Sequence, residues 1–254
     1  MKNVLAEAQR DALARLAWSN VLLGFDFDGT LAPTVLDPLS AMLRDSTRGL
    51  LDRLARLYPC VVISGRAVAD IELRMAGIAL RSVIGNHGLE PWRASDEMRF
   101  AVVRWKARLA PLLAELRGVE MEDKTYSLSV HYRRARQKRL SREAILRAVE
   151  LLDGVRVIPG KQVVNLLTLD APHKGIALER ERERLGCDSA FFVGDDETDE
   201  DVFALDRSEH LFTVRVGARR ASRAMYFVRD QREVDELLRR LIELRSELGQ
   251  REAR

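Results

Sequence analysis

The sequence predicts an α/β fold, in which a parallel sheet is flanked by helices and a smaller α+β unit is inserted. Short apolar runs alternate with amphipathic stretches from residue 21 to residue 86, and this alternation resumes after residue 174. The segment between these regions shows pairs of neighbouring strand patterns instead. With 254 residues, 46% of them hydrophobic, the chain can bury one large core and the core of an inserted domain.

The first alternating region predicts three strands and two helices. Leu50, Leu54 and Leu57 lie on one helical face, and a second helix is expected over residues 68–75. The strands are the apolar runs at residues 21–27, 60–64 and 82–86. Their βαβαβ order predicts a parallel sheet with helices on its faces.

The middle segment begins with a helix over residues 91–111, where Phe100, Val103 and Ala107 have helical spacing. Strand patterns at residues 119–133 and 155–167 follow, with a helix near residues 141–152 between them.

The second strand pattern is expected to be a hairpin that turns at Pro159-Gly160. An antiparallel unit inserted into the parallel fold accounts for this order. We therefore expect a core domain over residues 1–90 and 170–254, and an inserted α+β domain over residues 91–169.

The two ends of the chain carry further predicted elements. Val4, Ala8, Ala12 and Leu16 have near-helical spacing, so we expect a docked amphipathic helix at the N-terminus. After residue 174, strands are expected at residues 190–194, 211–217 and 225–228, and a C-terminal helix has its apolar face at Val234, Leu237, Leu238, Leu241 and Ile242.

The charge balance argues against a polyanionic partner. The formal net charge is +3 with both signs interspersed, so neither nucleic acid nor a membrane is an expected partner. The basic run at residues 133–139 lacks stacking aromatics and is expected to be a solvated loop. No secretory signal or bilayer-spanning stretch is visible, so we expect a cytoplasmic protein, with a monomer favoured, in which Cys60 and Cys187 are free thiols.

Two carboxylates follow the first predicted strand. Asp26 and Asp28, followed by Gly29-Thr30, stand at its carboxyl end, where open α/β sheets bind ligands. One carboxylate there can attack phosphorus, and the other can protonate the leaving oxygen and then activate water. Because two neighbouring carboxylates repel each other unless a cation offsets their charge, the pair predicts bound Mg²⁺.

An acidic loop follows the strand at residues 190–194. It carries six carboxylates between Asp195 and Asp201, and these would repel one another without a metal. We expect Asp195 to bind Mg²⁺ directly, and Asp196 and Asp199 to orient the water ligands of the metal.

Two further motifs supply groups that bind phosphate. Ser64, Gly65 and Arg66 follow the second strand, where a hydroxyl and backbone N–H groups at a helix start form a phosphate cradle. Lys174 opens a later helix, a position that the helix dipole disfavours for a cation. We expect Lys174 to neutralise the phosphoryl oxygens and the Asp26 carboxylate.

In this order, DFDGT, SGR, Lys174 and GDDETDED resemble the four motifs of the haloacid dehalogenase (HAD) superfamily, over most of the chain. The resemblance implies a HAD-like Rossmann-type core, Mg²⁺ and an aspartyl-phosphate mechanism. It makes Asp26 the nucleophile and Asp28 the acid/base, which also binds the metal through its backbone carbonyl. It assigns the phosphate to Ser64 and Lys174, and it completes the metal site with Asp195.

A narrower resemblance is to the trehalose-6-phosphate phosphatases, whose inserted domain is a cap. GNHGLE at residues 85–90 is similar to one segment of that family, and PGK at residues 159–161 is similar to another. The family's cap commonly shows a lysine, a serine and HYR, which are matched by Lys124, Ser127 or Ser129, and His131-Tyr132-Arg133. The substrate-binding residues that this implies are His87, Glu90, Lys124, His131, Arg133, Lys161 and Asn165.

The match departs from the family at one place. In the pattern GKxxExR, Asn165 and Leu167 stand where the family usually has Glu and Arg. The resemblance implies that this glutamate binds sugar hydroxyls, so the departure bears on the choice of sugar more than on the phosphatase chemistry.

The resemblance implies the hydrolysis of trehalose 6-phosphate. An alternative is the same chemistry on sucrose 6-phosphate or a glycosyl-3-phosphoglycerate. A catalytically silent regulatory module is a further alternative, and the four intact motifs argue against it. The small net charge argues against a nucleic-acid binder. A phosphomutase would share the core motifs.

Overall fold

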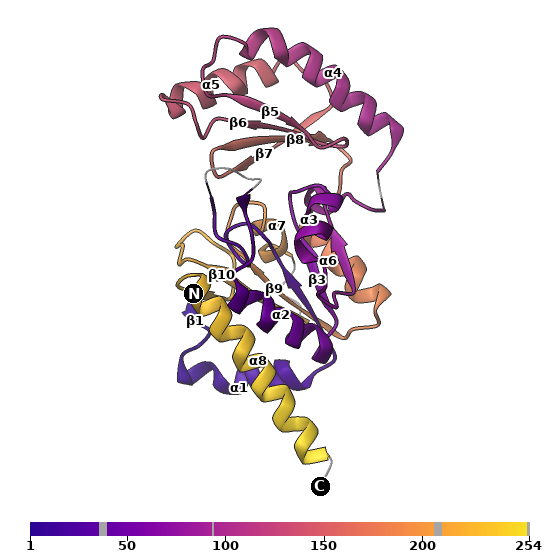
Figure 1. Ribbon diagram of the computed structural model, residues 1–254, viewed down its shortest axis with the longest axis vertical. Helices are drawn as coiled ribbons and strands as arrows, with labels where there is room; N and C mark the ends of the chain where they lie inside the picture. Colours follow the sequence, from indigo (N-terminus) through magenta and orange to yellow (C-terminus); the bar gives the residue numbers. More distant parts are fainter. Residues whose placement is uncertain (36–39, 93, 206–209, 253–254) are drawn as a thin grey trace.

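The computed structural model describes residues 1–35, 40–92, 94–205 and 210–252, and its elements form two sheets, one above the other in Figure 1. The larger sheet is parallel and has the strand order β1-β11-β10-β9-β2-β3-β4. Its strands are β1 (Lys2–Asn3), β2 (Val21–Phe25), β3 (Cys60–Ile63), β4 (Ser82–Ile84), β9 (Ser189–Gly194), β10 (Leu211–Val216) and β11 (Tyr226–Val228). The predicted parallel α/β core is confirmed.

Helices cover both faces of this sheet because its buried strands are apolar on both sides. On β2, Leu23 and Phe25 face one apolar cluster and Leu22 faces another. The first cluster includes residues of α1 (Arg10–Trp18), α2 (Asp45–Leu57), α3 (Val68–Met75) and α8 (Gln231–Glu252). The second includes residues of α6 (Lys174–Arg184) and α7 (Glu200–Phe203).

The N-terminal prediction is only partly correct. Lys2 and Asn3 pair with β11, and the helix α1 begins only at Arg10, after a 3₁₀ turn η1 (Glu7–Gln9). Val4 is fully buried but Ala8 is exposed. Strand pairing at the edge of the sheet satisfies the first backbone groups, so the near-helical spacing does not extend to them.

The smaller sheet is antiparallel and has the order β5-β6-β8-β7. Helices α4 and α5 cover the face that points away from the larger sheet (Figure 1). These elements are α4 (Asp96–Leu113), β5 (Glu120–Asp123), β6 (Leu128–His131), α5 (Lys138–Val149), β7 (Val155–Gly160) and β8 (Val163–Thr168), all between β4 and α6 in the chain.

Helix α4 exists as predicted but buries a different face. Phe100 and Val103 are 54% and 55% exposed, while Val102 and Trp105 pack in the core of the smaller unit. Similarly, Leu57 at the end of α2 is 37% exposed. Helical spacing identifies a helix, but a helix with two apolar stripes can bury only the one that meets the sheet.

The hairpin also turns later than predicted. Pro159 and Gly160 pair with Val164 and Val163, so the turn is Lys161-Gln162, with Gln162 at φ 63°. Strand β7 lies at the edge of its sheet, where a proline costs no ladder hydrogen bond. The shift matters because it puts Lys161 at the tip of the hairpin.

In the described part of the chain, no helix combines the length and the apolar character that crossing a membrane requires.

Candidate active site

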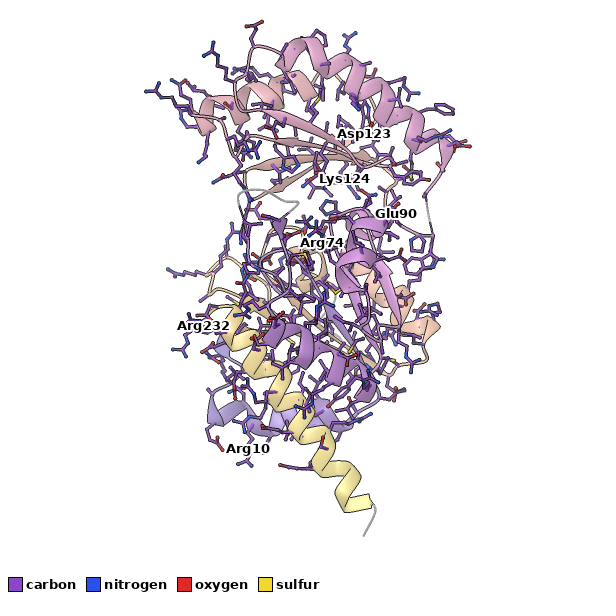
Figure 2. All side chains as sticks on the ribbon, viewed as in Figure 1. Arg10, Arg74, Glu90, Asp123, Lys124 and Arg232 are labelled. Carbon is purple, nitrogen blue, oxygen red and sulfur yellow. The ribbon has the colours of Figure 1, made fainter. Side chains whose placement is uncertain are left out.

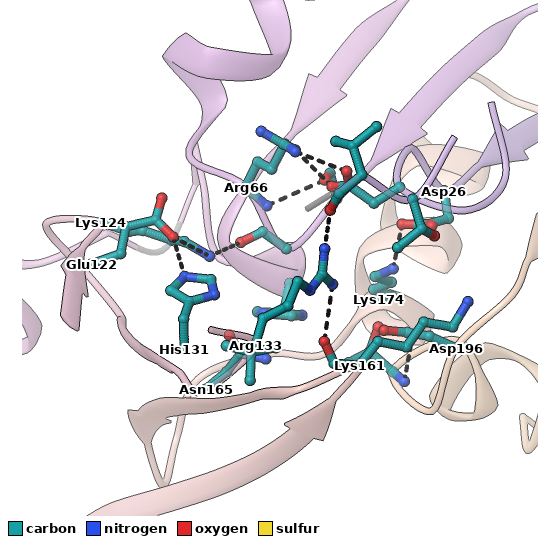
Figure 3. Close-up of a pocket in the computed structure, with 18 residues that line it drawn as sticks. Asp26, Arg66, Glu122, Lys124, His131, Arg133, Lys161, Asn165, Lys174 and Asp196 are labelled. Carbon is teal, nitrogen blue, oxygen red and sulfur yellow. Dashed lines mark hydrogen bonds and ion pairs between the residues drawn. The ribbon is translucent and has the colours of Figure 1, made fainter. Parts of the chain in front are cut away.

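A cavity of about 130 Å³ lies between the two sheets, where β2, β3 and β9 end side by side. Figure 2 shows Lys124 of the smaller unit and Glu90 of the larger one near this junction, and Figure 3 shows the cavity itself. Every predicted site residue lines it except Glu90, Asp195 and Asp199. These lining residues are Asp26, Asp28, Ser64, Gly65, Arg66, His87, Lys124, His131, Arg133, Lys161, Asn165, Lys174 and Asp196.

Lys174 joins two buried carboxylates at the floor of the cavity. Its Nζ donates to Asp26 Oδ1 at 2.7 Å (Figure 3). It also donates to Asp199 Oδ1 at 2.8 Å. Burial raises the pKa of Asp26 well above its ordinary value, and Asp199 and Asp195 add to the rise against the effect of Lys174. Burial disfavours the charge on Lys174, but Asp199 and Asp26 outweigh it and raise its pKa.

The start of α6 explains how a buried lysine can open a helix. His173 caps the helix, because its Nδ1 accepts hydrogen bonds from the backbone N–H groups of Gly175 and Ile176 at 3.1 and 3.4 Å. The dipole penalty on Lys174 is offset by the two carboxylates that it contacts.

A group of oxygen ligands lies beside this pair. Carboxylate oxygens of Asp26, Asp195 and Asp199 all lie within 4.8 Å of one another. Burial and the nearby Asp199 raise the pKa of Asp195 to about 7 against the effect of Lys161. Among the described residues, the Oδ1 atom of Asp195 has no hydrogen-bond partner although it is buried. A buried cluster of oxygen donors with an unpaired oxygen fits a hard divalent cation.

Gly29 allows the loop after β2, which carries Asp26 and Asp28, to lie against Asp195 in the loop after β9. Its φ is 89°, and a Cβ atom there would lie 2.1 Å from Asp195 Oδ2. Glycine is therefore required both by the backbone conformation and by the space that the carboxylate occupies.

Asp199 and Asp196 shape the second acidic loop. Asp199 Oδ2 accepts from the backbone N–H groups of Asp195 and Asp196, at 2.7 and 3.0 Å. Asp196 Oδ1 accepts from Thr198, and Lys174 and Thr198 hold the pKa of Asp196 low despite its burial. The predicted role of both carboxylates around a metal stays a prediction.

The loop that follows β3 contributes Ser64 and Arg66. Ser64 is buried, and its Oγ accepts from the backbone N–H of Arg66 at 3.2 Å. The guanidinium of Arg66 contacts Asp28 and Asp70. The structure thus gives Arg66 partners other than the phosphate that the sequence predicted for it.

His87 and Glu90, from the same predicted segment, lie in different surroundings. His87, in the turn η3 (Asn86–Gly88), is 5% exposed, and burial with nearby Lys124 lowers its pKa to about 3. Within the described residues, neither ring nitrogen of His87 has a hydrogen-bond partner. Glu90 does not line the cavity. Its Oε2 accepts from Val68 N–H and the Asn86 side chain, both at 2.8 Å, and its predicted contact with the substrate stays a prediction.

Strands β5 and β6 bring a charged group that sequence reasoning missed. Glu122 lines the cavity, 2.8 Å from His131 Nε2 and 3.7 Å from Lys124 Nζ. Although burial opposes its charge, hydrogen bonding with His131 and the charge of Lys124 lower its pKa to about 2. Because Glu122 stands two residues before Lys124, strand alternation could have identified it.

Polar contacts join the two units around the cavity. Lys124 Nζ donates to Gly65 O at 3.0 Å, and burial lowers its pKa. Arg133 donates to the carbonyls of Val35 and Lys161, and Lys161 Nζ pairs with Asp195. The smaller unit is therefore bound directly to the loops that follow β2, β3 and β9.

The two positions that depart from the family pattern lie in different surroundings. Asn165 lines the cavity, and its Oδ1 accepts from Ser129 Oγ at 2.6 Å. Leu167 is fully buried and packs with Leu89 and Met98. Ser127 bonds to Asn86 instead, so both predicted serines are engaged.

The fold and the site together define a class: a parallel core with an inserted antiparallel sheet, and an acidic site at the strand ends, in a chain that matches a phosphatase family model, are those of a HAD-type phosphatase. Residues 24–232 match the family model described as trehalose-phosphatase. The chain belongs to the trehalose-phosphatase family.

Individual relatives agree with this assignment. The chain is 34% identical to the trehalose-phosphate phosphatase of Mycobacterium avium over 203 residues, which are 74% of this chain and 52% of that protein. It is 27% identical over 250 residues to probable trehalose-phosphate phosphatase 4 of Oryza sativa subsp. japonica, covering 91% and 68% of the two chains. It thus spans about half the length of the mycobacterial relative.

Among solved structures, the trehalose-6-phosphate phosphatase C-terminal domain of C. albicans superposes with a TM-score of 0.79 at 23% identity, over 92% of this chain and 97% of that one. At this identity the likeness supports the fold.

Proposed function

We propose that this protein is a Mg²⁺-dependent phosphatase that hydrolyses trehalose 6-phosphate to trehalose and inorganic phosphate. The observation that carries the proposal is the buried ion pair between Asp26 and Lys174 on the floor of a cavity whose upper wall is cationic and polar. A domain assignment belongs to the proposal: residues 1–90 and 170–254 form the core, and residues 91–169 form a cap.

The chemistry follows from the carboxylates at the end of β2. An oxygen of Asp26 attacks phosphorus, the bond from phosphorus to the sugar oxygen breaks, and Asp28 gives its proton to that oxygen. Water then attacks the aspartyl-phosphate while Asp28 takes back a proton, and the bond between phosphorus and Asp26 breaks to release phosphate. Lys174 and Ser64 hold the phosphoryl oxygens through both steps.

Asp26, Asp195 and the backbone carbonyl of Asp28 would hold Mg²⁺, consistent with the buried oxygen cluster described above. When bound, the ion would neutralise charge on the phosphoryl group and offset the repulsion among the carboxylates.

The cap residues suit a sugar. Glu122 offers a hydrogen-bond acceptor to hydroxyl groups, and Lys124, His131 and Arg133 offer donors or positive charge from the same side of the cavity. Such groups would close over a sugar and exclude water from the reacting phosphate.

Another sugar phosphate is the second candidate, and Asn165 is the observation that favours it. The amide lines the cavity without a charge and is already bound to Ser129. A sugar that presents a different set of hydroxyl groups could be accommodated at this position.

The test is phosphate release from trehalose 6-phosphate, sucrose 6-phosphate, a glycosyl-3-phosphoglycerate and p-nitrophenyl phosphate, with Mg²⁺ and with chelator. We expect preference for trehalose 6-phosphate, dependence on Mg²⁺, and loss of nearly all turnover in folded Asp26→Asn. Preference for another sugar phosphate would move the assignment to the second candidate. Turnover by Asp26→Asn close to that of the unmodified protein would contradict the mechanism.

A further inference from the structure

The Arg66 guanidinium forms a bidentate ion pair with the Asp28 carboxylate. Its Nε donates to Asp28 Oδ2 at 2.6 Å, and its Nη2 donates to Asp28 Oδ1 at 2.8 Å. Its third nitrogen, Nη1, donates to Asp70 Oδ2 at 2.8 Å. Each of its three nitrogens therefore contacts a carboxylate, and the planar fork fixes both the distance and the orientation of Asp28.

Arg66 is held more firmly by its surroundings than Asp28 is. The Arg66 side chain is 10% exposed, and its guanidinium carbon lies 5.3 Å from the centre of the buried Phe27 ring. Asp70 in turn pairs with Arg74 at 2.8 Å. The Asp28 side chain is 40% exposed, so without Arg66 its carboxylate has room to turn into solvent.

We propose that Arg66 is a positioning residue for Asp28 and does not bind the substrate phosphate; this inference rests on the proposed phosphatase chemistry. A carboxylate has about four lone-pair sites, so Asp28 can accept both hydrogen bonds from Arg66 and still exchange a proton with the leaving oxygen. The phosphate is left to Ser64, Lys174 and the backbone.

The leaving group distinguishes this role from phosphate binding. A sugar oxygen or a phenolate is basic and must be protonated as it leaves, whereas p-nitrophenolate leaves without help. Because kcat/KM reports the step in which the leaving group departs, loss of Arg66 should lower it for poor leaving groups only. A phosphate ligand would lower it for every substrate, and inorganic phosphate would bind more weakly.

The experiment measures kcat/KM on phenyl phosphate and p-nitrophenyl phosphate, with the inhibition constant of inorganic phosphate, in the Mg²⁺-loaded full chain. For Arg66→Met we expect a loss of about a hundredfold on phenyl phosphate and less than about threefold on p-nitrophenyl phosphate. The inhibition constant should stay unchanged. Arg66→Lys, which keeps the charge without the fork, should show the same order with smaller losses.

Asp70→Asn, which loosens Arg66 without touching Asp28, should also affect phenyl phosphate more than p-nitrophenyl phosphate. The control is Arg56→Met, because Arg56 forms an exposed pair with Asp52 on α2 and should alter neither substrate. If Arg66→Met fails to fold, the losses of Arg66→Lys and Asp70→Asn on phenyl phosphate, compared with those on p-nitrophenyl phosphate, test the role of Arg66 instead.

Equal losses on both aryl phosphates with a raised inhibition constant would assign Arg66 to the phosphate and overturn the inference. Rates on both substrates that match the unmodified protein would overturn it as well. Neither aryl phosphate contains a sugar. If the protein hydrolysed none of the sugar phosphates, the proposed substrate would be refuted, but this test of Arg66 would still apply.

Discussion

Lys174→Met should destabilise the protein strongly, because it leaves Asp26 and Asp199 buried without their shared cation. The Lys174 side chain is 2% exposed, and those of Asp26 and Asp199 are 6% and 0% exposed. Removing one partner from a buried ion pair costs about 3–5 kcal/mol, a large share of the stability of a typical domain. Methionine retains most of the volume, so the loss reflects charge rather than a cavity.

The loss should depend on pH in a defined direction. The pKa values of Asp26 and Asp199 are already raised in the folded protein by burial, and removal of Lys174 takes away a charge that opposes the rise. The folded protein then binds more protons than the unfolded chain at pH values above 3.8 and below the raised pKa values. The destabilisation should therefore be greatest at high pH and shrink as the pH falls toward 3.8.

Urea unfolding in chelator at pH 8 and pH 5.5 measures both effects. Lys106→Met is the matched control, because Lys106 pairs with Asp123 at 3.1 Å but is 48% exposed, and it should cost less than about 1 kcal/mol at either pH. If Lys174→Met cost no more than Lys106→Met, or cost more at pH 5.5 than at pH 8, the electrostatic account of the site would be wrong.

Three further outcomes are expected. Asp195→Asn should raise the melting temperature in chelator, because it removes a buried carboxylate whose pKa is already raised to about 7. It should also abolish the increase in melting temperature that Mg²⁺ causes, and an unchanged Mg²⁺ effect would exclude Asp195 as a ligand. Because the pKa of His87 is lowered from 6.5 to about 3, the free energy of unfolding should fall as the pH falls below about 6.5, by at most about 1.4 kcal/mol per pH unit. His87→Gln should reduce this pH dependence in urea unfolding measured from about pH 7 to about pH 5. Arg133→Ala should lower kcat/KM on the sugar phosphate about ten- to hundredfold and leave kcat/KM on p-nitrophenyl phosphate unchanged, and equal losses on both substrates would contradict a role in sugar recognition. The control is Arg134→Ala, at an exposed ion pair, which should change kcat/KM on neither substrate.

The core of the fold was predictable because its strands are short apolar runs that are bounded by turns. Asp26, Ser64 and Asp195 could be expected to meet because parallel strands end at one edge of a sheet. The order of the strands along the chain is enough to bring these residues to one edge, whatever the side-chain packing.

Features that depend on packing could not be predicted in the same way. The spacing of Phe100 and Val103 is helical, but only the position of the smaller sheet decides that they face solvent. Pro159-Gly160 has the composition of a turn, yet at an edge strand it continues the ladder. Arg66 and Asp28 lie 38 positions apart, and no pattern in the sequence links them.

The ion pair between Lys174 and Asp26 closes a loop of 148 residues, and the elements from Asp96 to Thr168 account for about half of it. Loop-closure entropy grows only logarithmically, so doubling a loop costs about 0.6 kcal/mol. That cost is small beside the about 3–5 kcal/mol lost when one partner of a buried ion pair is removed. The chain can therefore carry a whole second folding unit between Asp26 and Lys174 at little thermodynamic cost. The inserted unit, which we propose selects the substrate, can thus vary in length and sequence while Asp26 and Lys174 keep their positions.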